Sequence, residues 1–178
     1  QFIKNKIKVK NGILASDIKK FYKSYFKYKK ENDLPYLAAK IAISKDFYTK
    51  NVKNKWITNE FSRGRSHFMR SLYDSILTGV QTVIKDNSKL TCRIIGLENR
   101  SPTRFVLDKQ LKIPIDSYIV KSAKKYSTII FFNKINTKKI DYLKKSKIKL
   151  IRITINKNGE FNLKNILKKI KLLGYSRI

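Results

Sequence analysis

Arginine is the scarce basic residue of this chain, so its positions are the first place to look for chemistry. Eight of the 42 lysine and arginine residues are arginines. A guanidinium offers phosphate a rigid two-pronged donor edge, whereas an ammonium offers a point charge. Arg70 ends a predicted helix and Arg93 closes the segment 90–93, so the two side chains could converge on one ribose phosphate. The alternative is that both lie on the surface and pack their aliphatic stems there. The same attention is due to Arg63, Arg65 and Arg104.

A second constellation begins at Gly79, which ends a predicted strand. Glycine puts no side chain between the backbone and a ligand, so a dinucleotide could approach closely. If the next segment is helical, the Thr82 hydroxyl and the Asp86 carboxylate lie on the same side of it. The alternative is an ordinary strand–helix turn in which Asp86 is a solvated capping group. Trp56, the only tryptophan, could lie flat against a cofactor or fill the core.

Metal and disulfide chemistry are restricted because the chain has one cysteine, Cys92, and one histidine, His67. A single cysteine excludes a disulfide within the chain and a thiolate metal cluster. Zinc usually takes three or four nitrogen or sulfur ligands, so we expect no metal site and no zinc-dependent base deamination here. No apolar run approaches the roughly 20 residues of a membrane span, and no signal-peptide pattern is present. These features predict a cytoplasmic protein.

The formal net charge of +30 would ordinarily make nucleic acid the first partner to consider. The excess is carried by lysine, and asparagine, isoleucine, tyrosine and phenylalanine are abundant too, as an AT-rich genome would produce without selection for binding. A nucleic-acid surface also needs exposed aromatic side chains on which bases stack. Here the aromatic residues stand at core spacings, so a charge-driven nucleic-acid-binding module is the less favoured alternative.

The apolar spacing predicts helices and strands in alternation. Helices are expected at 16–28, 58–72, 141–147 and 163–173. Ser16 and Asp17 should cap the first, and Gly174 should be the C-cap of the last. In the second, Phe61, Phe68 and Leu72 are expected to be buried. Strands are expected at 36–44, 75–79, 103–108, 127–132 and 148–155. This alternation predicts one α/β domain with helices on the faces of a sheet.

Three segments, in this order and at these spacings, resemble the reductase domain of the bacterial bifunctional riboflavin-biosynthesis enzyme. They are residues 34–44 (LPYLAAKIAIS) followed by 55–58 (KWIT), residues 75–93 (SILTGVQTVIKDNSKLTCR) and residues 101–108 (SPTRFVLD). The resemblance extends from about residue 12 to the end of the chain. It implies a dihydrofolate-reductase-like mixed sheet flanked by helices. It also implies an NADPH-dependent reduction that converts the ribosyl group of 5-amino-6-(5-phosphoribosylamino)uracil to the ribitylamino form.

The resemblance carries over to individual residues. It implies contacts with NADPH at Ala42, Trp56, Thr82 and Asp86, and contacts with the phosphorylated pyrimidine at Asn54, Arg70, Leu90 and Arg93. Three positions depart from the family pattern: Phe47 replaces a glycine, Asn54 replaces a serine, and Lys109 stands where the family often has a small hydroxyl residue. We expect Lys109 to point into solvent. No proton donor is identified, and Lys40 and Asp86 are the nearest candidates.

The resemblance also bears on domain organisation. Residues 1–33 are expected to be a linker and helix that follow an upstream deaminase domain, and residues 34–178 the reductase domain without its C-terminal strands. In the family, the next strand carries a glutamate that contacts substrate and a glycine pair that cradles cofactor phosphates. The main alternative is therefore a non-catalytic, truncated reductase-like fragment. An uncovered sheet edge would also favour a homodimer.

Overall fold

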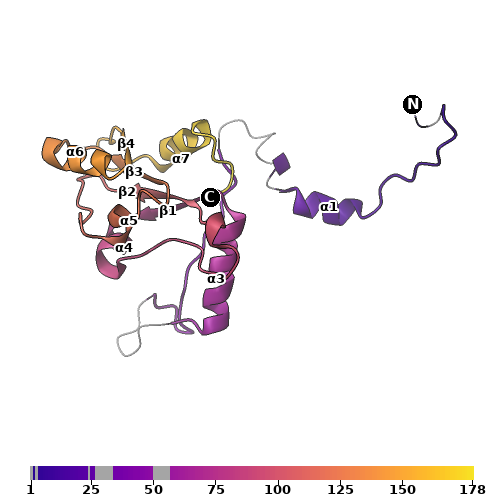
Figure 1. The fold of residues 1–178 in the computed structure, drawn as a ribbon, viewed down its shortest axis with the longest axis horizontal. Helices are drawn as coiled ribbons and strands as arrows, with labels where there is room; N and C mark the ends of the chain where they lie inside the picture. The colour runs from indigo at the N-terminus through magenta and orange to yellow at the C-terminus, as the bar shows by residue number, and fades with distance from the viewer. Residues whose placement is uncertain (1, 3, 24, 27–33, 50–56) are drawn as a thin grey trace.

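The computed structural model describes residues 2, 4–23, 25–26, 34–49 and 57–178 (Figure 1). A four-stranded sheet forms its centre. The strands are β1 (Ser75–Gly79), β2 (Thr103–Leu107), β3 (Thr128–Phe132) and β4 (Lys149–Arg152). They pair in the order β1-β2-β3-β4, every pair is parallel, and Leu77, Phe105 and Ile129 lie in one row across the sheet. All five residues of β3 are buried, as expected for a central strand covered on both faces.

The helices between consecutive strands cover one face of this sheet. They are α4 (Val80–Asp86), α5 (Tyr118–Lys121) and α6 (Thr137–Lys145), and a short 3₁₀ helix, η1 (Glu98–Arg100), precedes β2. Val106 and Ile130 point from the sheet into the apolar cluster on this face, where they meet Val83, Ile119 and Leu143. Because the strands are parallel and are added across the sheet in sequence order, their crossover helices pack on the same face.

A single helix, α7 (Leu163–Leu172), covers the opposite face. Ile166, Leu167 and Ile170 bury against Phe105 and Phe131, whose rings stack 5.6 Å apart. Gly174, with φ +95°, ends the helix in a left-handed turn. The N–H of Tyr175 donates to the Ile170 carbonyl and the N–H of Gly174 to the Lys171 carbonyl, which is the Schellman arrangement. Gly174 therefore ends the helix as predicted, although it stands one position after the C-cap residue, Leu173.

After α7 the chain returns to the edge of β1 that does not pair with β2. The N–H of Ser75 donates to the Arg177 carbonyl, and Tyr36 and Ala38 donate to Ser176 and Ile178 in turn. The carboxylate of Asp74 accepts hydrogen bonds from the Ser176 hydroxyl and from the N–H groups of Ser176 and Arg177, at 2.8–3.2 Å. Residues 176–178 are thus held between β1 and the segment that begins at Leu34.

Several predicted elements are confirmed and others need correction. Strands 75–79, 103–108 and 127–132 form within one residue of their predicted bounds, whereas 148–155 forms only at Lys149–Arg152 and the helix predicted at 141–147 begins at Thr137. The strand predicted at 36–44 is wrong. Only Tyr36 makes a ladder pair, with Arg177, and the Ile41 side chain is 69% exposed. A strand requires a neighbouring backbone, and this segment finds one only as far as Ala38.

Helix α3 (Glu60–Leu72) forms where predicted but presents its other side to the body of the protein. Phe61, Phe68 and Leu72, which were expected to be buried, are 82%, 49% and 42% exposed. Asn59 caps the helix by accepting from the Ser62 N–H. The residues that face inward are instead Ser66, His67, Met69 and Arg70, so a polar stripe of this helix is directed toward the sheet.

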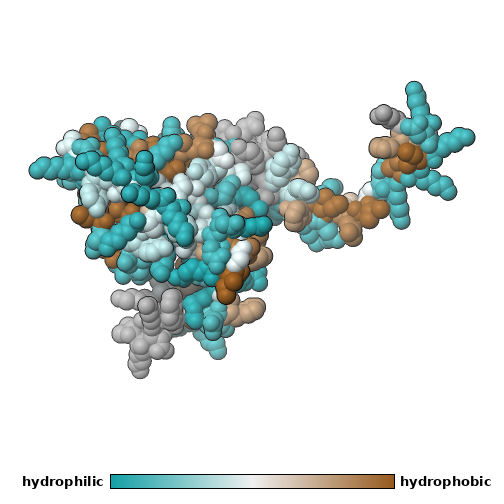
Figure 2. All heavy atoms as spheres, viewed as in Figure 1, coloured by the Kyte–Doolittle hydropathy of each residue, from teal (hydrophilic) through white to brown (hydrophobic). Residues whose placement is uncertain are grey.

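The N-terminal helix α1 (Ala15–Phe21) lies apart from the sheet (Figure 1). It begins after Leu14, which makes no side-chain cap, so Ser16 is not the N-cap, although Asp17 does stand in the first turn. Its apolar side chains, with Tyr22, Tyr25 and Phe26 just beyond, are exposed. Figure 2 shows brown, hydrophobic spheres on the surface of this helix. In the part of the chain that the structure describes, no helix has the length and apolar character needed to cross a bilayer.

Arg104, the second residue of β2, is the largest fully buried side chain among the described residues. Its Nε and Nη2 donate to the Thr128 hydroxyl at 3.0 and 2.6 Å, and Nη2 also donates to the carbonyls of Ile119 and Tyr126. Its Nη1 donates to the Lys89 carbonyl and the Ser122 hydroxyl. Burial lowers the pKa of Arg104 to about 10, so the guanidinium remains charged at neutral pH. Neutral oxygens from four segments therefore solvate a buried cation.

Replacing this guanidinium should be among the most destabilising changes in the protein. We expect Arg104→Met to lower the free energy of unfolding by about 3–5 kcal/mol, because it leaves several buried carbonyl and hydroxyl groups without a donor. The matched control is Arg100→Met on the exposed end of η1, which should change stability by less than about 0.5 kcal/mol. Urea denaturation measures both, and a loss below about 1 kcal/mol at Arg104 would contradict the assigned role.

Candidate functional site

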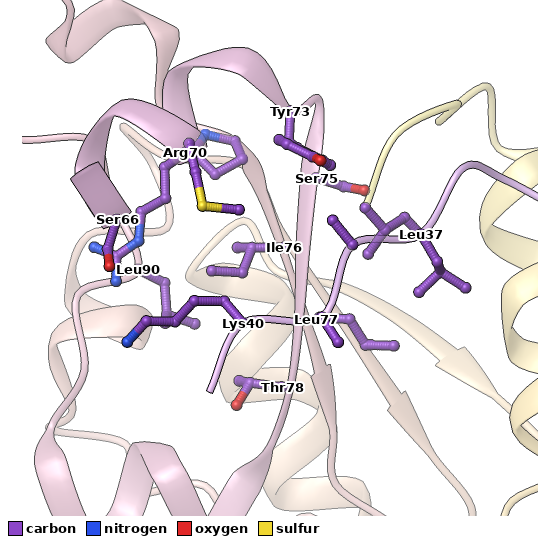
Figure 3. A pocket seen from close by; sticks show the side chains of 15 residues that line it. Leu37, Lys40, Ser66, Arg70, Tyr73, Ser75, Ile76, Leu77, Thr78 and Leu90 are labelled. Atoms are coloured by element: carbon purple, nitrogen blue, oxygen red, sulfur yellow. The ribbon is translucent and has the colours of Figure 1, made fainter. Parts of the chain in front are cut away.

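A groove of about 470 Å³ lies between β1, α3 and residues 37–40 (Figure 3). It is lined by Ile76, Leu77 and Thr78 of β1 and by Ile178 near the end of the returning segment. β1 is also where the winding of the sheet reverses, because β2 adjoins one edge and residues 176–178, which arrive over the other face, adjoin the other. Ligands of open α/β sheets generally bind near such a reversal, and this groove runs along β1 from Ser75 to Thr78.

Three of the residues that line the groove were singled out in the sequence. Arg70 comes from α3, Leu90 from the loop after α4, and Lys40 from the segment beside β1. Figure 3 shows the ends of these three side chains on the same side of β1, with Leu37 on the other side. Arg70 and Leu90, both expected to contact substrate, are thus brought together across a gap of 20 positions in the sequence.

Leu90 is held in an unusual backbone conformation. Its φ is +57°, and a non-glycine residue pays roughly 1–2 kcal/mol to adopt this left-handed region. The neighbouring carbonyls are fixed from both sides, since Arg104 donates to that of Lys89 and Arg70 donates to that of Thr91 at 3.0 Å. The side chain of Leu90 is only 7% exposed. The loop that leads to Arg93 is therefore anchored by two arginines.

Arg70, His67 and Arg93 form a basic cluster beside the groove. The Nε2 atom of His67 lies 3.2 Å from Nε and 2.8 Å from Nη2 of Arg93, and its Nδ1 lies 3.1 Å from the Thr91 carbonyl oxygen and 3.3 Å from Nη1 of Arg70. Within the described part of the chain, no carboxylate bonds to any of the three. Two guanidinium groups that bond to no carboxylate of the described residues are suited to an anion such as phosphate.

Burial and mutual repulsion shape the ionisation of this cluster. The pKa of His67 is lowered from 6.5, first by burial and then by the charges of Arg70 and Arg93. The hydrogen bond with the Thr91 carbonyl acts to raise this pKa. Burial also lowers the pKa of Arg70, with a smaller contribution from Arg93. The two arginines are close enough for each to disfavour further positive charge nearby, so an anion bound between them would relieve this repulsion.

The second predicted constellation follows β1. Gly79 is the N-terminal flanking residue of α4, and a Cβ built on it would have no atom within 4 Å. Residues 80–86 are helical as predicted, so Thr82 and Asp86 stand four positions apart on one side of α4, Thr82 half-buried and Asp86 exposed. Neither lines the groove, although Thr78 one residue before Gly79 does.

The remaining sequence-based candidates divide into three groups. Asn54 and Trp56 lie outside the residues that the structure describes, so their roles stay predictions. Ala42 is half-buried in the segment that continues from Lys40. Lys109 was expected to point into solvent, which is wrong: its Nζ donates to the Gly159 carbonyl at 2.6 Å and ties the turn after β4 to the end of β2.

Sequence reasoning missed the part that His67 plays. Its signal was its position three residues before Arg70, because residues at that spacing lie on the same face of a helix. Ser66, Met69 and Tyr73, which also line the groove from α3 or its end, carried no comparable signal.

Comparisons with known proteins bear on the whole chain. The family model described as "RibD C-terminal domain" matches residues 35–178. The chain is 34% identical over 169 residues to the riboflavin biosynthesis protein RibD of Aquifex aeolicus (strain VF5), covering 94% of this chain and 45% of that protein. It is 30% identical over 111 residues to the 2,5-diamino-6-ribosylamino-4(3H)-pyrimidinone 5′-phosphate reductase of Candida glabrata, covering 56% of this chain and 45% of the relative.

A solved structure supports the fold. A diaminohydroxyphosphoribosylaminopyrimidine deaminase/5-amino-6-(5-phosphoribosylamino)uracil reductase from Thermotoga maritima matches with a TM-score of 0.75 at 23% identity, over 99% of this chain and 46% of that one. This confirms the α/β, dihydrofolate-reductase-like fold expected from the sequence. The sheet was expected to be mixed, whereas the four strands of the described residues are all parallel. The chain spans slightly less than half the length of the Aquifex and Thermotoga proteins.

Proposed function

The chain belongs to the RibD C-terminal domain family, the reductase portion of riboflavin-biosynthesis proteins, and on that premise we propose that it takes part in the NADPH-dependent reduction of 5-amino-6-(5-phosphoribosylamino)uracil. The product would be the ribitylamino compound. The observation that carries this proposal is the convergence of Arg70 and Arg93 on either side of His67 beside a groove, with Arg93 bonded to the His67 ring and Arg70 to the Thr91 carbonyl. A phosphorylated sugar needs such a fixed, doubly cationic anchor.

At the substrate end, the two arginines bind the phosphate and the groove takes up the sugar. Arg70 and Leu90 line the groove directly. Arg93 bonds to His67, whose other ring nitrogen shares the Thr91 carbonyl oxygen with Arg70. Charge-assisted hydrogen bonds from two guanidinium groups set the direction of the phosphate as well as its affinity. With the phosphate fixed, the sugar carbon that is attached to the amino group is positioned along the groove.

At the cofactor end, the residues fit a dinucleotide. Gly79 leaves the approach to the end of β1 open, since a Cβ there would meet no atom, and Thr82 and Asp86 offer a hydroxyl and a carboxylate to ribose hydroxyl groups. NADPH, when bound, supplies the hydride that opens the ribosyl ring. The task of the chain is to orient the two ligands against each other and to exclude water.

The ring oxygen that is released needs a proton. Lys40 and Asp86 were the two candidates from the sequence, and their locations favour Lys40. Both side chains are exposed, but Lys40 lines the groove with Arg70 and Leu90, whereas Asp86, at the last position of α4, does not. An ammonium group in the groove can donate a proton to an alkoxide as it forms. We therefore assign the proton-donating role to Lys40.

One observation favours a second candidate function. The aromatic side chains at 18–26, expected at core spacing, are exposed beside Lys19, Lys20 and Lys23 on and after α1. Exposed rings among lysines are the arrangement that single-stranded nucleic acid prefers. Salt separates the two functions, because affinity that rests on charge alone disappears as ionic strength rises.

The nucleotide site is tested by Gly79→Ala. Because φ at Gly79 is −82° and a Cβ has open space, alanine is unstrained there, and we expect the free energy of unfolding to fall by no more than the roughly 1 kcal/mol that alanine costs at an N-cap. NADPH affinity, measured calorimetrically at moderate salt in the full-length encoded protein, should fall about tenfold as the added methyl group obstructs the cofactor. Gly64→Ala, on the open side of α3, is the control and should leave NADPH affinity unchanged. Equal NADPH affinity in wild type and Gly79→Ala would refute this placement.

The phosphate site is tested by Arg93→Ala in the same protein. We expect substrate affinity to fall by about 1.5–3 kcal/mol, the scale of a hydrogen bond to a charged group, with little change in NADPH affinity. Arg100→Ala, on the neighbouring 3₁₀ helix, should affect neither ligand. Equal losses for substrate and cofactor at Arg93 would show that the residue does not mark the substrate end.

A further inference from the structure

His67 stands between two arginines, an unusual environment for an imidazole. Its ring is half-buried on the inward side of α3. One ring nitrogen, Nε2, faces two N–H donors of the same guanidinium, Nε and Nη2 of Arg93, at 3.2 and 2.8 Å. The other, Nδ1, faces the Thr91 carbonyl oxygen at 3.1 Å. Nε2 therefore faces hydrogen-bond donors, and Nδ1 faces an acceptor.

These partners determine where the proton of the ring lies. Arginine has donors and no acceptor, so Nε2 must provide a lone pair to Arg93. The Thr91 oxygen can only accept, so Nδ1 must carry the hydrogen. The 3.3 Å approach of Arg70 Nη1 to Nδ1 is then a contact between two donors, and the hydrogen bond of Arg70 goes to the Thr91 carbonyl instead, at 3.0 Å. The neutral Nδ1–H tautomer satisfies every partner.

We infer that His67 is a positioning residue of the phosphate site, which accepts the Nε/Nη2 edge of Arg93 and so directs the remaining Nη1/Nη2 edge of that guanidinium toward the anion. This role rests on the proposed phosphate site. Within the described residues, Nη1 of Arg93 makes no hydrogen bond, so this edge is available. Arg93 is exposed, and without an acceptor behind it its long side chain would sample many rotamers.

The charges around the ring reinforce the neutral form. Arg70 on α3 and Arg93 on the loop face it, and both oppose a positive ring. The buried Cys92 thiol lies near Arg70. Glu98 belongs to η1, which packs against α3, and its carboxylate accepts a hydrogen bond from the Gly96 N–H at 2.9 Å. Protonation of His67 would replace the lone pair with a third N–H that faces Arg93, so the ring would release Arg93 as the pH falls.

Two substitutions separate the two ring nitrogens. The amide of a glutamine reaches the position of Nε2, so His67→Gln keeps an acceptor for Arg93. The amide of an asparagine reaches only the position of Nδ1, so His67→Asn keeps the donor to Thr91 and loses the acceptor. In the full-length encoded protein, we expect His67→Asn to raise KM for the phosphorylated pyrimidine about tenfold with kcat nearly unchanged, and His67→Gln to raise it less than about threefold. If His67 served only to support the fold, the two variants would raise KM by similar factors.

Because the chain has a single histidine, its ring can be observed without ambiguity. In protein labelled with ¹⁵N-histidine, we expect the ring nitrogen shifts at pH 7 to report the Nδ1–H tautomer. Adding inorganic phosphate should raise the ring pKa, because an anion offsets the charges of Arg70 and Arg93. Arg93→Ala should remove most of this response to phosphate.

The pH dependence of the free energy of unfolding is a further test of the state of His67. The folded-state pKa of His67 lies below the 6.5 of the unfolded chain, so between the two values the unfolded state binds more protons. The stabilising contribution is therefore complete above pH 6.5 and is lost as the pH falls through the folded-state value. Relative to His67→Gln, which does not titrate, the wild type should lose urea stability over that window.

The outcomes are distinguishable. An Nε2–H or charged ring at pH 7, no response of the ring to phosphate, or equal KM values in His67→Asn and wild type would each overturn the inference. If the protein reduces no pyrimidine, the proposed function fails, and the ring tautomer together with the response to inorganic phosphate still decides the role of His67.

Discussion

The buried guanidinium of Arg104 is the interaction on which the candidate site depends. It lies in the central strand β2 and donates to oxygens of β3, of α5 and of the loop after α4. A cation in this position is costly unless all of its donors are satisfied, so the surrounding segments are held to the few arrangements that satisfy them. Among the groups so fixed is the Lys89 carbonyl, immediately before Leu90 with its positive φ. The path of the loop toward Arg93 is therefore set from inside the sheet.

The same loop is fixed from outside by α3. Arg70 donates to the Thr91 carbonyl and His67 shares that oxygen, so the helix and the loop meet on one acceptor. This explains why the inward side of α3 is polar and its phenylalanines are exposed: the helix packs through hydrogen bonds to a loop rather than through an apolar stripe on the sheet. The net charge of +30 attracts any polyanion, whereas this small arginine cluster has the geometry to discriminate a phosphate.

The groove owes its location to topology. Three crossover helices pack on one face, α7 packs on the other, and the chain then returns beside β1. β1 is therefore flanked by segments that arrive from opposite faces, and the side chains of residues 37–40, β1 and α3 line the space where they meet. Asp74 stabilises this return by accepting three backbone or hydroxyl donors from residues 176 and 177.

The sequence by itself determined the strands β1, β2 and β3 and the helix α7 with its terminal glycine, because period-two and period-3.6 patterns are local signals. The family resemblance also selected Arg70 and Leu90 together, and both line the groove. The sequence pattern misassigned 36–44, since an apolar run forms a strand only where another backbone lies beside it. It placed Phe61 and Phe68 on the wrong side of α3 and sent Lys109 into solvent, since spacing identifies a face of a helix but not what that face meets. The tertiary structure alone decided that Arg104 is buried and that His67 stands between two arginines. Both facts depend on hydrogen-bond partners 15 to 26 positions away in the sequence, which no local pattern encodes.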